Sequence, residues 1–343
     1  MSIKKIENLP KVTGRTKKEL LDLLICEEFG YLPKGTRTVE AELVKEEKRF
    51  AAGKARLLTL RLTVRAEFGV FSFPVYYARP TAEGKHPCFI HINFRDAIPD
   101  QYQPTEELLD LGYAILTFCY KDVSSDDGDF TNGLAGAVYP DGKRGERDCG
   151  KIGLWAYAAM AVMDYAQTLE ELDHSRISVV GHSRLGKTAL LAGALDERFL
   201  CAFSNDSGCG GASIARGNTG ETVGKIVDRF PYWFAESYWK YADREEEMPF
   251  DQHFLLAANH PHAVYVASAA QDAWACPENE YLSCVEASAY YKEQGGVGFV
   301  HPDRMPVVGD KMHEGQIGYH LRDGLHYLSR EDWARYVEFL KTL

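Results

Sequence analysis

The residues with the clearest chemical potential lie in a glycine-flanked turn around Ser183. The motif GHSRLGK occupies positions 181–187, between an apolar run at 177–180 and a segment with helical spacing at 188–195. A strand that passes into a helix through such a turn exposes its serine at the tip of a sheet. The helix then points its first N–H groups at an oxyanion formed beside that serine. The motif therefore predicts Ser183 as the nucleophile of an acyl transfer.

The motif departs from the usual elbow pattern G-x-S-x-G in one respect. Leu185 stands where the second glycine is expected, and Gly186 follows one residue later. Small residues suit any tight turn, so the alternative interpretation is a structural turn with an incidental serine. The catalytic interpretation requires a base and an acid at suitable places in the chain.

A histidine near the C-terminus fits the role of general base. Hydrolases built on this turn present serine, acid and histidine in that chain order. Of the eleven histidines, His326 alone lies between a predicted final strand at 316–321 and a predicted final helix that Ser329 caps. We therefore predict His326 as the base and a structural role for His320, which lies inside that strand.

Two carboxylates qualify as the acid. A neutral imidazole takes the serine proton only if a carboxylate fixes its tautomer and stabilises the imidazolium. Asp206 ends the predicted strand at 201–205, and Asp272 follows the next predicted strand at 263–267, which is the usual acid position in the wider hydrolase fold. Both assignments stay open at this point.

The elements that must position these residues follow a recognisable order. Before Pro87, three segments between 39 and 79 alternate apolar and polar residues, which predicts antiparallel strands at one edge of a sheet. After it, short apolar strands alternate with helical patterns, as in a parallel sheet covered on both faces. We therefore predict an α/β-hydrolase fold, a three-layer sandwich with a mostly parallel central sheet and antiparallel N-terminal edge strands, in one domain over 1–343. The expected parallel strands lie at 88–93, 113–119, 177–180, 201–205, 263–267 and 316–321, and the expected helices at 16–29, 152–172 and 188–195.

Composition excludes several classes of function. The formal net charge of -11 argues against nucleic acid as a partner, because phosphate binding relies on clustered Lys and Arg. No apolar run is long enough for a membrane span, and residues 1–7 carry no apolar signal region. We therefore expect a cytoplasmic protein, or a secreted one if a signal segment was removed. The eight cysteines lack the spacing of zinc ligands, so no metal site is expected.

Several separated motifs resemble the glucuronoyl esterases of carbohydrate esterase family 15. They occur in the family's order over essentially the C-terminal half of the chain. These motifs are GHSRLGK at 181–187, SNDSGCGG at 204–211, FDQH at 250–253, DAW at 272–274, His326, and DW at 332–333. The resemblance implies hydrolysis of esters between 4-O-methyl-glucuronic acid on xylan and lignin alcohols, without a metal or organic cofactor.

The resemblance also implies roles for individual residues. Ser183 would be the nucleophile, and Arg184 would hold the oxyanion with its backbone N–H and its guanidinium. The uronate hydroxyls would be contacted by Lys187, Glu221 and Trp274. Helical spacing puts Arg184 and Lys187 close together on the first turn, where both cations favour an oxyanion and a uronate product.

The resemblance bears on the choice of acid as well. Asp206 matches the family's acid position, so we place it ahead of Asp272. The family commonly has Glu there, and the shorter reach of Asp keeps Asp272 as the alternative. Fungal members have a cysteine before the nucleophile, bridged to a residue beside the catalytic histidine. Here His182 precedes Ser183, and Leu325 and Tyr327 flank His326, so packing alone is expected to support the site.

The expected partner is a small-molecule or oligosaccharide uronate ester. Two other functions compete with the uronate esterase. A carbohydrate acetyl esterase or a general carboxylesterase would use the same triad. A non-catalytic carbohydrate-binding protein would lack a triad member, and none is missing from the sequence.

Overall fold

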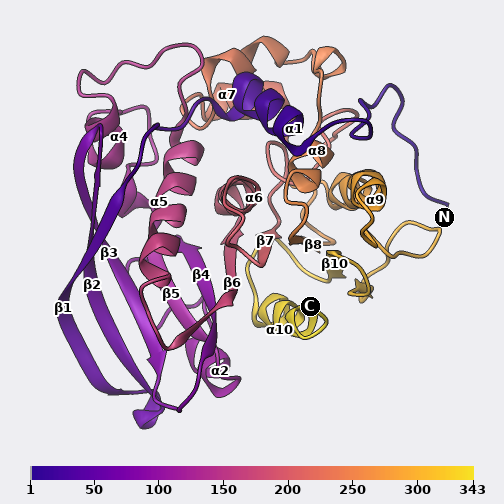
Figure 1. The fold of residues 1–343 in the computed structure, drawn as a ribbon. Coiled ribbons are helices and arrows are strands. Elements are labelled where there is room, and N and C mark those ends of the chain that lie inside the picture. Colours follow the sequence, from indigo (N-terminus) through magenta and orange to yellow (C-terminus); the bar gives the residue numbers. More distant parts are fainter. Residues whose placement is uncertain (1) are drawn as a thin grey trace.

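The fold is built on one ten-stranded sheet. The computed structural model describes residues 2–343 (Figure 1). The strands are β1 (Thr38–Phe50), β2 (Ala55–Ala66), β3 (Gly69–Pro80), β4 (His86–Asn93), β5 (Ala114–Cys119), β6 (Leu172–His182), β7 (Cys201–Asn205), β8 (Ala263–Ala269), β9 (Lys311–Met312) and β10 (Ile317–Arg322). They lie in the order β1-β2-β3-β5-β4-β6-β7-β8-β10-β9.

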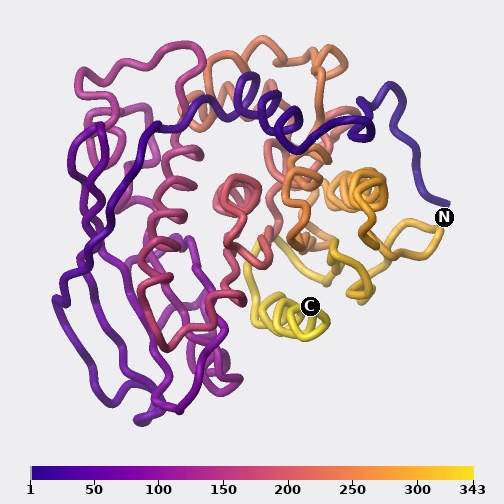
Figure 2. Tube along the Cα trace, in the orientation of Figure 1, coloured from indigo at the N-terminus to yellow at the C-terminus, as the bar shows by residue number. Residues whose placement is uncertain are grey.

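The strand directions agree with the sequence patterns. Neighbours from β5 to β10 pair in parallel, whereas β1, β2 and β3 run antiparallel at one edge and β9 at the other. The predicted mostly parallel sheet with an antiparallel N-terminal edge is confirmed. In Figure 2 the purple strand region lies at the left and the yellow C-terminal part at the lower right, while the indigo N-terminal segment crosses the top of the molecule to the right. The catalytic candidates all come from the second half of the chain.

Helices cover the two faces unequally. The helices are α1 (Lys17–Leu24), which continues as a π-helix at Ile25–Phe29, α2 (Thr105–Asp110), α3 (Tyr120–Val123), α4 (Gly133–Val138), α5 (Lys151–Ala166), α6 (Arg184–Leu195), α7 (Val223–Arg229), α8 (His253–Ala257), α9 (Pro277–Glu293) and α10 (Arg330–Leu340). Short 3-10 turns lie at Ala51–Gly53, Glu236–Tyr241 and Glu245–Glu247. One core packs α1, α5, α6, α8 and α9 on one face, and a smaller core packs α2 and α10 on the other (Figure 1).

Several predicted element boundaries differ from the observed ones for local reasons. The helix expected at 152–172 ends at Ala166, because Leu172 pairs with His86 and already belongs to β6. The helix expected at 188–195 begins four residues earlier, at Arg184, because Ser183 is its N-cap. Strand β9 has only two residues, too few to leave a periodic pattern in the sequence.

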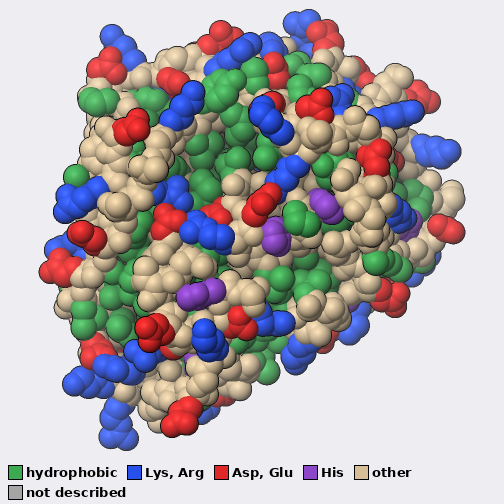
Figure 3. Space-filling view, viewed as in Figure 1, with side chains coloured by type: hydrophobic (Ala, Val, Ile, Leu, Met, Phe, Trp, Pro, Cys, Tyr) green, Lys and Arg blue, Asp and Glu red, His purple; other side chains and the backbone are tan. Residues whose placement is uncertain are grey.

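The open edge of the sheet is protected by charge. Strand β1 is largely exposed, and its glutamates face arginines on β2, with Arg61 Nη1 at 3.0 Å from Glu42 Oε2 and Arg56 paired with Glu46. Figure 3 shows basic and acidic side chains interspersed over the face it displays. Charged edge strands discourage pairing with another chain. Within residues 2–343, no helix combines the length and the apolar character that a membrane crossing requires.

Helix α10 is fastened to the sheet at its first turn. Ser329 and Asp332 form a capping box, in which the Ser329 N–H donates to Asp332 Oδ2 at 2.6 Å. The same carboxylate lies 2.9 Å from His320 Nε2 and accepts from Arg322 Nε at 3.0 Å, both on β10. The loop between β10 and α10, which carries His326, is therefore held at both ends.

Trp333 provides the test of this attachment. Its buried ring packs edge-on against Phe89 and His91, and its Nε1 donates to the Tyr102 carbonyl at 2.8 Å. We predict that Trp333→Ala lowers the free energy of unfolding by about 3–5 kcal/mol, as for other buried large-to-small changes. Urea denaturation followed by circular dichroism measures it. The control Trp239→Ala removes a ring that is 40% exposed and should stay within about 0.5 kcal/mol of the parent; equal losses would refute the prediction.

Candidate active site

Ser183 lies at the tip of the sheet in a strained backbone conformation. It joins β6 to α6 with φ 58° and ψ -127°, a region that non-glycine residues rarely adopt. Its N–H donates to the Asn205 carbonyl at 2.8 Å, which ties the turn to β7. A Cβ on Gly181 would lie 2.0 Å from the Leu185 carbonyl oxygen, so only glycine fits there.

The shifted second glycine has a structural explanation. A Cβ on Gly186 would lie 3.0 Å from Ser204 Oγ and 3.0 Å from Ser207 Cβ, so the tight packing of α6 against β7 falls on this residue. Leu185, by contrast, is fully buried in the larger core. The departure from G-x-S-x-G therefore leaves the elbow geometry intact.

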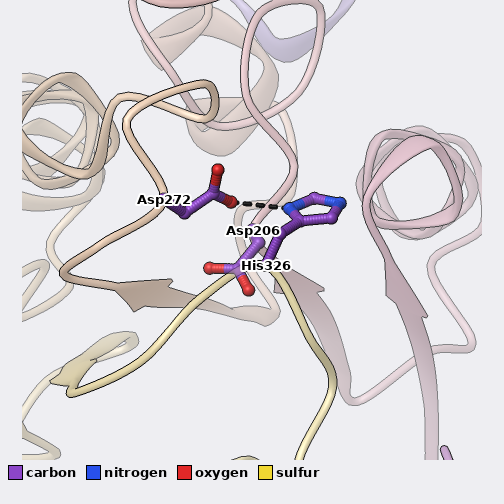
Figure 4. A group of neighbouring side chains, drawn as sticks. All are labelled: Asp206, Asp272 and His326. Carbon is purple, nitrogen blue, oxygen red and sulfur yellow. Dashed lines mark hydrogen bonds and ion pairs between the residues drawn. The ribbon is translucent and has the colours of Figure 1, made fainter.

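His326 is hydrogen-bonded to Asp272 rather than to Asp206. Its Nδ1 lies 2.6 Å from Asp272 Oδ2, and Figure 4 shows that carboxylate directed at the ring. The two residues come from the loops that follow β10 and β8. Burial acts to raise the pKa of Asp272, but the hydrogen bond and charge of His326 outweigh it and lower this pKa. Asp272 therefore remains an anion behind the imidazole.

Asp206 is used elsewhere, contrary to its first place among the predicted acids. Its Oδ1 accepts from the Ala269 N–H at 2.8 Å, and its Oδ2 accepts from Arg322 Nη2 at 3.2 Å and the Tyr327 N–H at 3.3 Å. Burial, followed by the charges of Glu280 and Asp332, raises the pKa of Asp206, and Arg322 opposes this. The carboxylate anchors the loop next to His326 without bonding its ring.

Ser183 and His326 line the same pocket, which has a volume of about 230 Å³. Ligand pockets for drug-sized molecules are usually about 300–1,000 Å³, so this one suits a compact group such as a single sugar ring. The pocket is lined by Ser183, Arg184, Lys187, Asp206, Ser207, Gly208, Glu221, Arg229, Phe230, Trp233, Trp274, Ala275 and His326. All of the predicted site residues except Asp272 are in this lining, and Asp272 bonds His326 from behind it.

The two predicted cations are both compensated by carboxylates. Arg184 forms an ion pair with Asp126, and its guanidinium carbon lies 4.7 Å from the ring centre of Trp233. Lys187 is only 2% exposed, and its ammonium donates to Glu221 Oε2 at 2.8 Å, to the Ser207 carbonyl at 2.6 Å and to the Cys209 carbonyl. All three ammonium protons therefore have acceptors within the protein, so a substrate hydroxyl would have to replace one of them.

Glu221 connects Lys187 to the pocket mouth. Its second oxygen, Oε1, accepts from Trp274 Nε1 at 3.1 Å, and its own N–H donates to the Trp274 carbonyl at 2.8 Å. Trp274 is 41% exposed, which leaves its ring accessible from solvent. The three predicted sugar-binding residues thus form one connected row.

His182 packs against His326, whose loop is also held by hydrogen bonds. The ring centres of His182 and His326 are 4.4 Å apart, and His182 Nδ1 lies 2.6 Å from Asn205 Oδ1. Burial, and then the charge of His326, lowers the pKa of His182 to about 3, so this ring is neutral at physiological pH. All eight cysteines are free.

Asp206, Asp272 and His326 each place one ligand atom within 4.8 Å of the others, which is compact enough for a metal ion. The existing partners of these three side chains indicate a role other than metal binding. Asp206 already faces the cation Arg322, and His326 Nδ1 is engaged by Asp272. This cluster therefore has the chemistry of an acid–base pair backed by a structural ion pair.

The sequence did not single out several pocket residues. Phe230 and Trp233 form one wall, with their rings stacked 3.8 Å apart, and Asp126 holds Arg184. Two sequence features could have indicated them: the long segment at 121–147, rich in Gly, Asp and Ser, and the aromatic stretch at 232–241.

Comparisons with known proteins agree with this geometry. The sequence model described as "Glucuronyl esterase, fungi" matches residues 62–295. Carbohydrate esterase MZ0003, from an unknown prokaryotic organism, is 39% identical over 236 residues, which are 68% of this chain and 54% of that protein. The 4-O-methyl-glucuronoyl methylesterase of Podospora anserina is 28% identical over 282 residues, 77% of this chain and 54% of that protein. The solved structure of a promiscuous CE15 esterase from the marine bacterial metagenome has a TM-score of 0.86 at 28% identity, covering 100% of this chain and 97% of that one.

The chain spans about half the length of these two curated relatives. The structural match extends over the whole chain and confirms the predicted α/β-hydrolase fold. The family match covers more than half of the chain and contains Ser183, Asp206 and Asp272. The chain therefore belongs to the glucuronoyl esterase family, whose named members are carboxylic ester hydrolases.

Proposed function

We propose that this chain hydrolyses esters of 4-O-methyl-glucuronic acid through a Ser183-His326-Asp272 triad and an acyl-enzyme. One observation carries the proposal: His326, hydrogen-bonded to Asp272, lines the same small pocket as Ser183. Family membership and the named methylesterase relatives support the substrate class.

The first half of the reaction forms the acyl-enzyme. Ser183 Oγ attacks the ester carbonyl carbon while His326 Nε2 takes the hydroxyl proton. Asp272 accepts the hydrogen bond from Nδ1–H, which fixes the tautomer and stabilises the imidazolium. The imidazolium then gives its proton to the departing alcohol oxygen, and the uronate carbonyl remains bonded to Ser183.

The oxyanion of the tetrahedral intermediate lies next to the start of α6. The first N–H groups of a helix have no partner within that helix, and Ser183 is the N-cap of α6. They can therefore donate to the oxyanion, and the guanidinium of Arg184 adds positive charge. Removing one such donor commonly slows an enzyme by about 10²–10³-fold.

The second half of the reaction releases the acid. A water molecule takes the place of the alcohol, His326 removes one of its protons, and the oxygen attacks the acyl carbon. The ester bond to Ser183 breaks, and the serine oxygen recovers the proton from His326. The products are the free uronic acid and the alcohol, and no metal or organic cofactor takes part.

Lys187, Glu221 and Trp274 would select the substrate by contacting its sugar ring. A sugar hydroxyl can exchange with the internal acceptors of Lys187 or donate to Glu221, and the exposed face of Trp274 can cover the ring. The substrate would be a small-molecule or oligosaccharide uronate ester. A simple acetate would leave this polar row unused.

The substrate class can be tested with a panel of three esters. We predict that methyl 4-O-methyl-glucuronate is hydrolysed with a kcat/KM at least about tenfold above that for nitrophenyl acetate. The acetate lacks the contacts with the polar row, and each loss of about 1.4 kcal/mol in transition-state binding lowers kcat/KM tenfold. Acetylated xylan is the third substrate. Ser183→Ala should abolish every activity. Acetate release without uronate ester cleavage would contradict the proposed substrate class.

The choice of acid is tested by a matched pair of variants. We predict that Asp272→Asn lowers kcat on the order of 10³-fold or more, because the imidazole loses its orienting anion. Asp206→Asn should mainly lower stability, by roughly 3–5 kcal/mol, because it leaves Arg322 without one buried partner. Its kcat should stay within about tenfold of the parent. Steady-state kinetics and urea denaturation separate the two effects, and a reversed order of kcat losses would assign the acid to Asp206.

The lowered pKa of Asp272 gives a pH dependence of stability. Because its folded-state pKa lies below the unfolded value, ionised Asp272 stabilises the fold above about pH 4. That stability is lost as the pH falls through the folded-state pKa. We therefore predict that the stability difference between the parent and Asp272→Asn is largest near neutral pH and shrinks below about pH 4. Urea denaturation at stepped pH measures it, and a constant difference would contradict the assignment.

A further inference from the structure

We propose that Asp126 is a positioning residue that fixes the guanidinium of Arg184 at the oxyanion site. The inference rests on the proposed function, in which Arg184 stabilises the oxyanion. Asp126 lies 58 residues before Arg184 in the chain, in the segment between α3 and α4. No motif in the sequence points to it.

Both oxygens of the Asp126 carboxylate accept hydrogen bonds from residues of the site. Its Oδ2 accepts from Arg184 Nη1 and from the Tyr120 hydroxyl at 2.9 Å. Its Oδ1 accepts from Trp233 Nε1 at 2.8 Å. The side chain is only 8% exposed, so these hydrogen bonds face little competition from water. Asp126 thus joins the arginine to one wall of the pocket through a single carboxylate.

Three aromatic rings surround the guanidinium of Arg184, and Asp126 adds a directional contact to it. The guanidinium carbon lies 4.7 Å from the ring centre of Trp233, 5.4 Å from that of Phe230 and 5.6 Å from that of Phe94. Such rings attract the cation electrostatically but offer its N–H groups no carboxylate or carbonyl acceptor. A charge-assisted hydrogen bond is directional. The carboxylate therefore decides where the remaining N–H groups point.

The loop that carries Asp126 is braced. Lys151 Nζ, from α5, donates to Ser124 Oγ at 2.8 Å and to the Asp129 carbonyl at 2.6 Å, and Trp155 Nε1 donates to the Ser124 carbonyl at 3.2 Å. Burial lowers the pKa of Lys151 to about 8, so the ammonium is still mostly charged at neutral pH. The Tyr232 hydroxyl adds a bond to the Asp126 carbonyl at 3.0 Å. Because the backbone is held before and after Asp126, its carboxylate keeps a fixed position relative to Arg184.

The inference is tested by a double-mutant cycle on Asp126 and Arg184. Asp126→Asn keeps the side-chain shape but removes the anion, and we expect kcat for methyl 4-O-methyl-glucuronate to fall roughly 10- to 100-fold, with KM within about threefold. In an Arg184→Met background, the same change should alter kcat by less than about twofold, because the group it positions is gone. Asp127→Asn is the matched control, since Asp127 is the exposed neighbouring carboxylate, and it should leave kcat within about twofold.

The possible outcomes separate the inference from the proposed function. If Arg184→Met keeps the parent kcat, the oxyanion role of Arg184 is wrong, whatever Asp126 does. If Arg184→Met is impaired and Asp126→Asn is not, the positioning role alone is overturned. Equal losses from Asp126→Asn in both backgrounds would also overturn it, since the effect would then bypass Arg184.

A milder variant covers the case in which Asp126→Asn does not fold. Tyr120→Phe removes one hydrogen bond to the Asp126 carboxylate without leaving an unpaired donor. It should lower kcat in the parent and not in the Arg184→Met background, and an unchanged kcat in the parent would count against the inference. Thermal unfolding of each variant checks that the fold is retained.

Discussion

The active site depends on the buried guanidinium of Arg322 at the end of β10. Its Nε donates to both oxygens of Asp332 at 3.0 Å, and its Nη2 donates to Asp206 at 3.2 Å and to the Leu325 carbonyl at 3.2 Å. A buried cation is tolerated only when its charge and its donors are matched, and here two carboxylates match them. These bonds join β10, the helix α10 and the loop after β7 around the segment that carries His326.

The carboxylates at this end of the sheet have two different roles. Asp206 and Asp332 neutralise Arg322 and hold the backbone, whereas Asp272 faces the imidazole. The ends of parallel strands meet at one edge, so three consecutive strand ends bring the loops together. Burial and like charges raise the pKa of Asp206 and the cation Arg322 opposes this, whereas the pairing with His326 lowers the pKa of Asp272.

Much of this layout follows from sequence patterns. Apolar runs marked the parallel strands, the glycines around Ser183 marked the elbow, and Ser329 marked the start of the last helix. The sequence did not predict which carboxylate pairs with Arg322 and which with His326. That choice depends on where the Arg322 side chain points, and an arginine within an apolar strand does not reveal its direction. The internal acceptors of Lys187 were equally hidden, since two of them are backbone carbonyls of a loop.

The pocket residues differ widely in exposure. Lys187 is almost inaccessible, whereas the side chain of His326 is 39% exposed and Trp274 is 41% exposed. For the proposed reaction, the scissile oxygen would lie beside the partly exposed His326. The leaving alcohol would then extend into solvent, so a bulky or polymeric alcohol would need no enclosure of its own. Discrimination would fall on the acid half of the ester, and attack on side branches of a long polysaccharide would require no threading of its backbone.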